Sequence, residues 1–341
     1  MSDMTNRRVI LKARPTGIPQ AEHFDLNAVP APELAEGEIL VRNSYLSVDP
    51  AMRGWLSDTK GYGTRIEVGD VMRAFAIGKV IRSRNSDFAP GDCLMGLFGW
   101  QELAAVRADQ VLLRINEQNF PLSLHLGVLG INGITAYFGL REIGAPKAGE
   151  TVLVSTAAGA VGSCVGQIAK ILGCNVIGIA GGPEKRQQCI EEFGFDAAID
   201  YKNESDLEAA INRLCPNGID VYFDNTSGAI SDAVLPNLAI GARVAVCGTA
   251  SIDSWNPWPL GPRCERHLLV KRAMMRGFLA LDYADRYDEA VSQLGQWVSE
   301  GKLRYREEIL DGLEQAPAAI ARLYSGKNQG KLLIRLPAAK G

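Results

Sequence analysis

A glycine-containing turn between a strand and a helix is the segment best suited to chemistry with a phosphorylated ligand. Residues 151–156 are predicted to form a buried strand, Ala157-x-Gly159-x-x-Gly162 a tight turn, and residues 160–170 an amphipathic helix. A helix N-terminus reached through such a turn offers backbone N–H groups to a dinucleotide pyrophosphate. The alternative is a tight turn without a ligand, but the flanking strand and helix favour the dinucleotide. The candidate ligands are the backbones of Ala158, Gly159, Ala160, Val161 and Gly162.

The end of the next predicted strand, residues 175–182, bears on the choice of cofactor. An NAD site usually has Asp or Glu there to bind the ribose hydroxyls. This chain has Gly181-Gly182-Pro183-Glu184-Lys185-Arg186 instead, with two cations and no carboxylate at the strand end. The missing carboxylate and the two cations therefore predict a site for the 2′-phosphate of NADP rather than NAD. The alternative is the solvated first turn of the next helix, where Glu184 offsets part of the charge.

Composition narrows the classes of function. The chain has 341 residues, 47% of them hydrophobic, and a net charge of −3 without a long run of one sign. We therefore expect neither nucleic acid nor a membrane as the main partner. The N-terminal residues 1–8 are polar and do not resemble a signal peptide, and the seven cysteines follow no disulfide-like pattern, so we expect a reduced, cytoplasmic protein.

A zinc site is not expected. The sequence contains neither Cys-x-x-Cys nor His-Glu-x-x-His, and its three histidines, His23, His125 and His267, lie far apart. A catalytic zinc needs three protein ligands placed close together, and a structural zinc needs four. Most of the cysteines fall in apolar runs, where a buried thiol is the usual explanation.

Hydrophobic periodicity divides the chain into two domains. Residues 1–125 are rich in short strands separated by Gly, Pro and Asp, a pattern typical of a partly closed barrel. Residues 126–303 alternate helix and strand, which predicts a parallel sheet with helices on both faces, and the last predicted strand is 276–280. The tail, residues 304–341, is predicted to return to the first domain.

The chain resembles the zinc-independent medium-chain dehydrogenase/reductases, in the branch of the prostaglandin, alkenal double-bond and curcumin reductases. The resemblance covers essentially the whole chain. It implies an α/β fold in which a Rossmann-type doubly wound parallel sheet, residues 126–303, accompanies a GroES-like β-barrel domain, residues 1–125 and 304–341. The motifs that carry it are Tyr45–Pro50 with Met52-Arg53, Gly133–Gly139, Ala157–Ser163, Gly166–Lys170, Phe223–Gly228, Cys247-Gly248, Gly277-Phe278 and Gly326–Lys331.

The resemblance also implies individual cofactor contacts. Lys185 would bind the 2′-phosphate, Tyr201 would lie near the adenosine phosphate, and Asn225 and Asn328 would contact the nicotinamide side and the phosphates. Without the resemblance, Tyr201 reads as a surface residue, the asparagines as turn formers, and Phe278 and Leu279 as core. The remaining implied contacts are Asn132, Thr135, Cys247, Gly248, Phe278 and Leu279.

In this family NADPH donates hydride to the β-carbon of an enone or enal, and a hydrogen-bond donor stabilises the resulting enolate. The tyrosine that often serves as the donor is replaced here by Asp253, and an ionised aspartate cannot donate. The donor is then another group: Tyr45, Ser251, Ser254, the Trp255 indole or the nicotinamide ribose. Trp255 and Trp258 are also candidates for the wall of an apolar pocket, or for simple packing of their loop.

Two other functions stay open at this point. One is an NADPH quinone oxidoreductase of the same superfamily, and the other is a protein that binds NADPH without turnover. The resemblance further implies a homodimer, which pairing of an exposed sheet edge near 276–280 would support. The expected substrate is a small unsaturated carbonyl compound.

Overall fold

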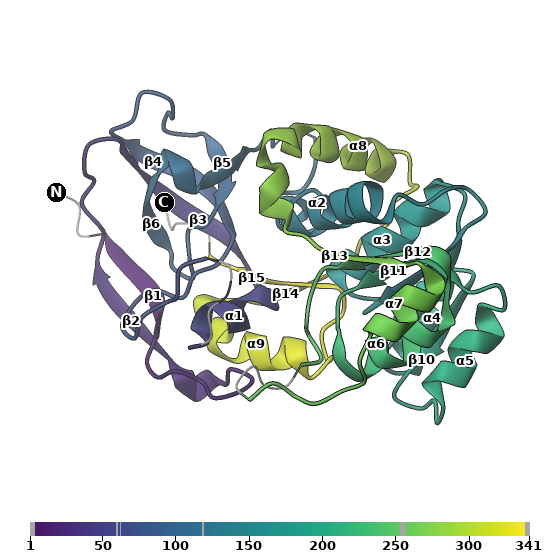
Figure 1. Cartoon of the computed structure of the whole chain (residues 1–341). Helices are drawn as coiled ribbons and strands as arrows, with labels where there is room; N and C mark the ends of the chain where they lie inside the picture. The colour runs from purple at the N-terminus through teal and green to yellow at the C-terminus, as the bar shows by residue number, and fades with distance from the viewer. Residues whose placement is uncertain (1–3, 59–60, 62, 118, 253–256, 338–341) are drawn as a thin grey trace. The chain divides into compact units, whose positions relative to one another are not determined.

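The computed structural model describes residues 4–58, 61, 63–117, 119–252 and 257–337. The chain forms two compact units, residues 1–127 with 307–341 and residues 128–306 (Figure 1). The predicted functional domains, 1–125 with 304–341 and 126–303, stay a prediction.

The unit of residues 128–306 is built on a parallel six-stranded sheet. Its strand order is β10-β9-β8-β11-β12-β13. The chain therefore adds β9 and β10 on one side of β8, and then returns to add β11, β12 and β13 on the other side. This is the strand order of a doubly wound dinucleotide-binding fold. The strands are β8 (Thr151–Ser155), β9 (Asn175–Ala180), β10 (Ala197–Asp200), β11 (Ile219–Asp224), β12 (Leu238–Val246) and β13 (Met274–Gly277).

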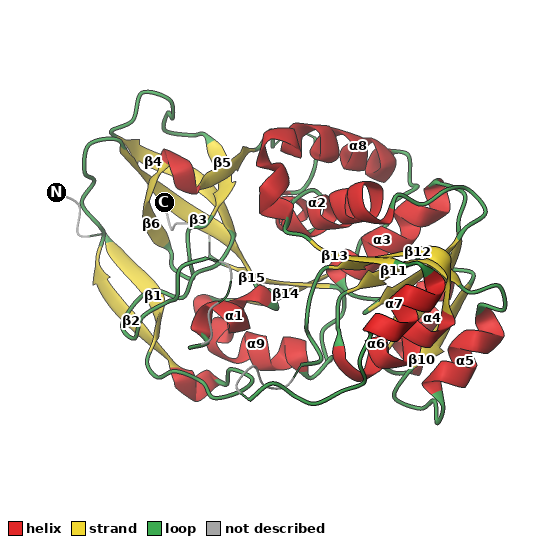
Figure 2. Cartoon of the chain, in the orientation of Figure 1, coloured by secondary structure: helices red, strands yellow, loops and turns green. Residues whose placement is uncertain are grey.

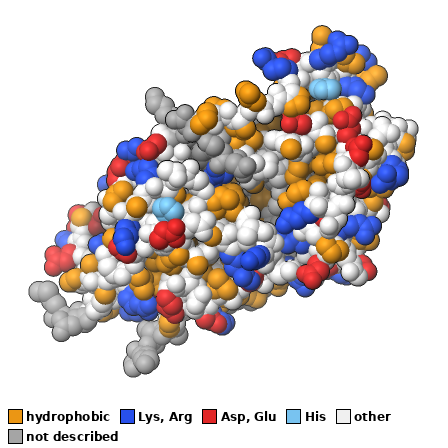
Figure 3. Space-filling model, turned by 90° about the horizontal axis from the view of Figure 1, so that it is seen from below, with side chains coloured by type: hydrophobic (Ala, Val, Ile, Leu, Met, Phe, Trp, Pro, Cys, Tyr) orange, Lys and Arg blue, Asp and Glu red, His pale blue; other side chains and the backbone are white. Residues whose placement is uncertain are grey.

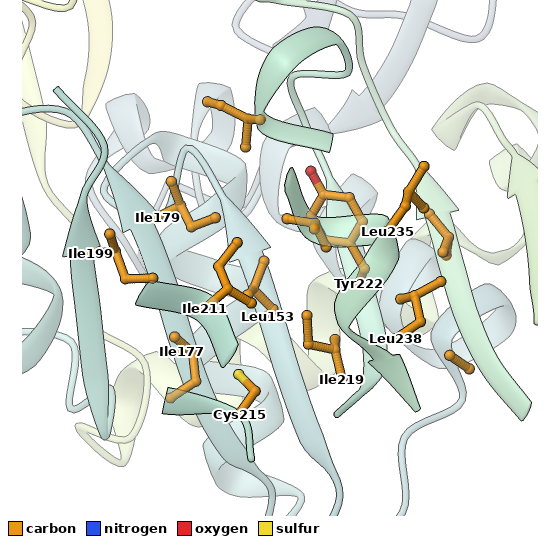
Figure 4. Close-up of a cluster of buried hydrophobic side chains, with 14 of the residues drawn as sticks. Leu153, Ile177, Ile179, Ile199, Ile211, Cys215, Ile219, Tyr222, Leu235 and Leu238 are labelled. Atoms are coloured by element: carbon orange, nitrogen blue, oxygen red, sulfur yellow. The ribbon is translucent and has the colours of Figure 1, made fainter. Parts of the chain in front are cut away.

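Helices cover both faces of this sheet (Figure 2). Ile177 and Ile179 of β9 point to one face, where they join a buried cluster with residues of the two helices α5 and α6 (Figure 4). Gly178 faces the opposite side and meets Phe195, whose ring also fills the space beside Gly166 of α3. The helices are α2 (Ile131–Phe138), α3 (Ala160–Ile171), α4 (Pro183–Glu191), α5 (Leu207–Leu214), α6 (Gly228–Val234), α7 (Glu265–Lys271) and α8 (Tyr287–Ser299).

The other unit is mostly antiparallel. β3 (Glu38–Ser47) is its longest strand. It pairs antiparallel with β4 (Ala76–Ser83), β6 (Leu103–Arg107) and β15 (Lys331–Arg335). The C-terminal strand thus completes a sheet begun near the N-terminus. The remaining elements are β1 (Thr5–Leu11), β2 (Phe24–Pro30), β5 (Cys93–Gly96), β7 (Val111–Arg114), β14 (Glu307–Asp311), α1 (Ala51–Leu56) and α9 (Ala316–Tyr324), with 3-10 turns such as η3 (Leu122–Leu126).

The predicted fold class is confirmed: a doubly wound parallel sheet accompanies a separate, mainly antiparallel sheet unit. The strand predicted at 276–280 is wrong in position, because the pairing of β12 with β13 covers 274–277 and leaves Phe278 and Leu279 beyond it. Among the described residues, no helix is long and apolar enough to cross a membrane.

Candidate cofactor site

The carboxyl ends of β8 and β11 lie side by side where the strand order of the parallel sheet reverses. In open α/β sheets a ligand binds outside the carboxyl ends of the strands at this switch point. The loops that follow these two strands are the glycine turn, residues 156–159, and the segment 225–227. The topology therefore places two of the predicted cofactor segments at the position where a dinucleotide binds.

The glycine turn is packed too tightly for side chains. A Cβ on Gly162 would lie 2.2 Å from the carbonyl oxygen of Thr156, so α3 can approach the turn only with glycine there. Gly159 N donates to the same oxygen at 2.8 Å, and Thr156 itself takes a left-handed φ of 53°. Among the described side chains, none caps the N-terminus of α3 at Gly159. The backbones of Ala158, Gly159, Ala160, Val161 and Gly162 thus surround an uncapped helix N-terminus suited to a pyrophosphate.

A second cluster forms after β9. A Cβ on Gly181 would lie 3.0 Å from both Tyr201 Cε1 and Lys202 Cε, so these side chains pack directly against the glycine. Lys185 lies half-buried in the first turn of α4, which begins two residues after Gly181. The structure thus brings Gly181 and Tyr201 together and adds Lys202, which the sequence analysis did not assign. The signal for Lys202 was its place directly after Tyr201 at a strand end.

Asp200 organises this cluster. Its Oδ1 accepts from Gly182 N at 2.7 Å and from Lys202 N at 3.1 Å, and its Oδ2 accepts from Asn203 at 2.6 Å. Burial acts to raise the pKa of Asp200, but these hydrogen bonds outweigh it and lower that pKa. The carboxylate is therefore occupied with the loop, while the neighbouring Lys202 is cationic.

The loop after β11 is held by a residue that the sequence analysis did not single out. Asp224 is 2% exposed and accepts from Tyr222 OH at 2.9 Å, Ser231 Oγ at 2.6 Å and Ser227 N at 2.8 Å. Asn225 ties this loop to β8, because its N donates to Ser155 Oγ at 2.8 Å and its Nδ2 to Ser155 O at 2.7 Å. The predicted contact Asn225 therefore sits at the switch point with its amide hydrogen-bonded to the neighbouring strand.

The end of β12 adjoins the same loop. Cys247 N and Gly248 N both donate to Asp224 O, and a Cβ on Gly248 would lie 2.9 Å from Asn225 O. Burial raises the pKa of the Cys247 thiol to about 12, so it is not a thiolate nucleophile. Cys247 and Gly248 thus contribute backbone and close packing at this site.

The remaining cofactor predictions in this unit fall on α2 and after β13. Asn132 is 8% exposed, and its Oδ1 is buried without a hydrogen-bond partner among the described residues. Such an orphaned acceptor fits a bound ligand. Thr135 Oγ1 donates to Ile131 O at 2.6 Å, while the Phe278 ring packs edge-on against Phe223 with centroids 6.0 Å apart. Leu279 follows it and is half-buried.

The predicted oxyanion donors have different surroundings. Ser251 Oγ lies 2.9 Å from Thr226 O and 2.8 Å from Ser227 O, so its single hydrogen is donated to the loop backbone. Tyr45 lies half-buried on β3 opposite Arg335 of β15. Trp255, together with Asp253 and Ser254, lies outside the described residues. Asn328, in the turn before β15, is buried and donates to Gly330 O at 2.8 Å.

Known proteins resemble the chain over almost its full length. It is 43% identical to the NADPH-dependent curcumin reductase of Escherichia coli, over 97% of this chain and 97% of that protein. It is 40% identical to the 2-alkenal reductase (NADP(+)-dependent) of Nicotiana tabacum, over 97% of this chain and 98% of that protein. The chain belongs to the medium-chain dehydrogenase/reductase family. The resemblance inferred from the motifs is confirmed.

Solved structures of the medium-chain dehydrogenase/reductase family agree with this assignment. CurA of Vibrio vulnificus in complex with NADPH superposes with a TM-score of 0.90 at 41% identity, over 97% of this chain and 99% of that chain. Residues 7–113 match a family described as the N-terminal domain of oxidoreductase, and residues 160–296 one described as zinc-binding dehydrogenase. Within the described part of the chain, no group of three or more His, Cys, Asp or Glu could hold a metal ion. Zinc independence stays a prediction.

Proposed function

We propose that this protein is an NADPH-dependent reductase that transfers hydride to the β-carbon of α,β-unsaturated carbonyl compounds without zinc. The observation that carries the proposal is the uncapped N-terminus of α3 at the switch point, with Lys185 and Lys202 close to the adjacent strand end. The relatives named as NADPH-dependent curcumin reductase and 2-alkenal reductase support the substrate class.

Different residues would bind different parts of NADPH. The N–H groups at the start of α3 would hold the pyrophosphate, while Lys185, Lys202 and Tyr201 would surround the 2′-phosphate. Since Asp200 is engaged with Gly182 N, its carboxylate is not free to bind the ribose hydroxyls of NAD. Asn132, with its unpartnered Oδ1, would accept a hydrogen bond from the cofactor.

NADPH, when bound, supplies the hydride. The protein must then stabilise the negative charge on the carbonyl oxygen with a hydrogen-bond donor. Because Ser251 donates to the loop backbone, we assign it to holding that loop rather than to the oxyanion. Tyr45 and Trp255 stay the proposed donors, and Tyr45→Phe and Trp255→Phe would separate them by the loss of kcat.

The test is NADPH oxidation with an alkenal, an aryl enone, a quinone and a saturated ketone, each repeated with NADH and followed by product analysis. We expect saturated carbonyl products and a preference for NADPH. Turnover of the quinone alone would replace the proposal with a quinone oxidoreductase, and NADPH binding without turnover would indicate a non-catalytic role.

Cofactor selectivity has its own test. Lys185→Ala and Lys202→Ala should each raise the Kd for NADPH by about tenfold and leave that for NADH unchanged, because only the former carries the 2′-phosphate. Lys302→Ala is the matched control, since Lys302 is exposed and pairs with Glu300 on another part of the unit. Equal weakening of both cofactors would remove these lysines from the 2′-phosphate site.

We further propose a cytoplasmic homodimer that pairs through β13. This strand is at the end of the sheet, and its Met274 and Met275 are 48% and 37% exposed. An unpaired edge with apolar side chains favours strand addition. Met274→Lys should shift sedimentation toward monomer, whereas Val68→Lys, at an exposed apolar site in the other unit, should not.

The expected small-molecule partner also agrees with the surface charge. Among the described residues on the face shown in Figure 3, Lys and Arg side chains are interspersed with Asp and Glu. A broad field of one sign, which would favour nucleic acid or an anionic membrane, is not the pattern on this face.

A further inference from the structure

The most enclosed ion pair among the described residues joins two segments that are far apart in the sequence. Lys331 Nζ lies 2.5 Å from Asp49 Oδ1, and the two side chains are only 4% and 6% exposed. Lys331 begins β15, and Asp49 follows β3 directly before α1. Both residues belong to motifs of the family resemblance, and neither of them has a role in the cofactor site described above.

The Lys331 ammonium has all three of its hydrogens matched by acceptors. It donates to Ser47 Oγ at 2.6 Å, to Val48 O at 3.1 Å and to Asp49 Oδ1 at 2.5 Å. Ser47 Oγ in turn donates to Asp49 Oδ2. Three consecutive residues thus surround one buried cation, which fixes the backbone of this segment as well as its side chains.

Further contacts join the same two segments. Val48 N donates to Leu332 O at 3.2 Å, and Tyr324 OH donates to Pro50 O at 3.0 Å. The Arg53 guanidinium lies 5.6 Å from the centroid of the Tyr324 ring. The first turn of α1 and the stretch from Tyr324 to Leu332 are therefore tied together at several points.

Asn328 lies within this tied stretch, three residues before Lys331. It is 7% exposed, and its Nδ2 bonds to Gly330 O, while the next residue, Gln329, donates its N to Glu308 Oε2 at 2.9 Å. Gly330 takes a left-handed φ of 77°, so the turn reverses directly before Lys331. The ion pair thus anchors the end of the turn that presents Asn328.

Stability alone does not account for these charges. Burying an ammonium and a carboxylate removes both from water, and well-packed apolar side chains of similar volume often stabilise a fold equally well or better. A buried pair with this many directed bonds does set a geometry that apolar packing would leave looser.

We propose that Lys331 and Asp49 are positioning residues that hold Asn328 in the orientation required for NADPH binding. This inference rests on the proposed function and on the contact between Asn328 and the cofactor that the family resemblance implies. Neither residue contacts the cofactor itself, since both act through the turn that carries Asn328.

The test is a double-mutant cycle read by NADPH binding and steady-state kinetics. The charge-free protein Asp49→Leu with Lys331→Met should keep its melting temperature but bind NADPH about tenfold more weakly. Asn328→Ala should weaken binding to a similar degree, and adding the charge-free pair to it should change little further, because both act through one contact. If the charge-free protein does not fold, Asp49→Asn with Lys331→Gln replaces it in the same cycle, since it keeps hydrogen-bonding groups.

Asp311→Asn is the matched control. It breaks an exposed ion pair with Arg335 on the same strand β15, and it should leave the Kd for NADPH unchanged. Unaltered NADPH binding in the folded charge-free protein would overturn the inference alone. Strictly additive effects with Asn328→Ala would also overturn it. A failure of the unaltered protein to bind NADPH would overturn the proposed function as well, so the two failures can be told apart.

Discussion

The two units of the molecule bury a carboxylate in different ways. Asp49, in the unit of residues 1–127 and 307–341, is compensated by the ammonium of Lys331. Asp224, in the other unit, accepts from Tyr222 OH, Ser231 Oγ, Thr226 N and Ser227 N. The charge of Asp49 is therefore balanced by a cation, whereas the charge of Asp224 is stabilised by hydrogen bonds from neutral hydroxyl and amide groups.

The difference follows from what each carboxylate connects. The shorter hydrogen bonds to Asp224 come from residues within seven positions along the chain, and a longer one, at 3.4 Å, comes from Ser155 Oγ on β8, so Asp224 mainly shapes one local loop. In that loop Ser227 has a φ of 57° and a ψ of −161°, a strained conformation for a residue with a side chain. Asp49 and Lys331 are 282 residues apart, and their charge pair adds to the strand pairing and hydrogen bonds that join the two segments. Local donors stabilise a strained turn, whereas a charge pair fixes distant pieces of chain.

The largest effect is expected at Asp224. Asp224→Ala should lower the free energy of unfolding by about 5 kcal/mol, because it leaves four hydroxyls and two backbone N–H groups without this acceptor. Asp224→Asn keeps one acceptor oxygen and can donate to Ser231 Oγ, so we expect a loss of about 2 kcal/mol. Urea unfolding measures both. Equal losses in the two variants would contradict this expectation, because they would show that the amide oxygen of Asn does not replace the carboxylate as an acceptor.

The next largest effect concerns the ion pair. Lys331→Met alone should cost about 4 kcal/mol, since it leaves Asp49 buried and unpaired. Adding Asp49→Leu should restore most of that loss, a rescue that no second substitution near Asp224 would give. The same urea titration measures this rescue. If Asp49→Leu with Lys331→Met were as unstable as Lys331→Met alone, the buried charge of Asp49 would not be the cause of the loss.

A third case is a buried group that lacks partners altogether. His125, on η3, is 6% exposed, and both of its ring nitrogens are without partners among the described residues. Burial lowers its pKa from 6.5 to about 4. Because the unfolded chain takes up the proton first, stability is complete above pH 6.5 and is lost as the pH falls toward 4.

That loss should reach about 2 kcal/mol at pH 5. His125→Leu should abolish this part of the pH dependence and preserve stability at pH 7. Melting temperatures recorded between pH 4 and pH 7 test it. If both proteins lost stability in parallel over this range, other groups would account for the acid sensitivity.

The smallest effect is expected at Glu307. Its Oε2 accepts from Ser123 Oγ at 2.9 Å, while Oε1 is buried and unpartnered within the described chain. Burial raises its pKa, against the hydrogen bond from Ser123 and the charge of Lys331. The folded state therefore favours the protonated form, and stability falls as the pH rises above the ordinary Glu value through the raised pKa.

Glu307→Gln should stabilise the protein at neutral pH, by on the order of 0.5–1 kcal/mol, and should have no such effect below the ordinary pKa of Glu. The neutral amide keeps an acceptor for Ser123 Oγ. Thermal unfolding at two pH values distinguishes this from a uniform shift, which would indicate a change in packing instead.

The sequence by itself determined the repeating strand-and-helix pattern, the glycine turn at 157–162 and the position of Lys185, because periodicity and turn chemistry are local properties. It did not single out β2, β7 and β14, whose residues are mostly half-buried or exposed. It placed the last strand of the parallel sheet two residues too late, because only pairing with β12 sets that register.

Only the tertiary structure decided which polar residues share a neighbourhood. Lys202 against Gly181, Asp224 beneath the loop at 225–227, and Lys331 beside Asp49 each depend on segments brought together by the fold. Ser251 carries a hydroxyl that could stabilise an oxyanion, yet the fold places two backbone carbonyl oxygens close to it, and the hydroxyl donates its hydrogen to them. The physical reason is common to all four: a polar group acts through the partner it reaches, and that partner is set by contacts distant in the sequence.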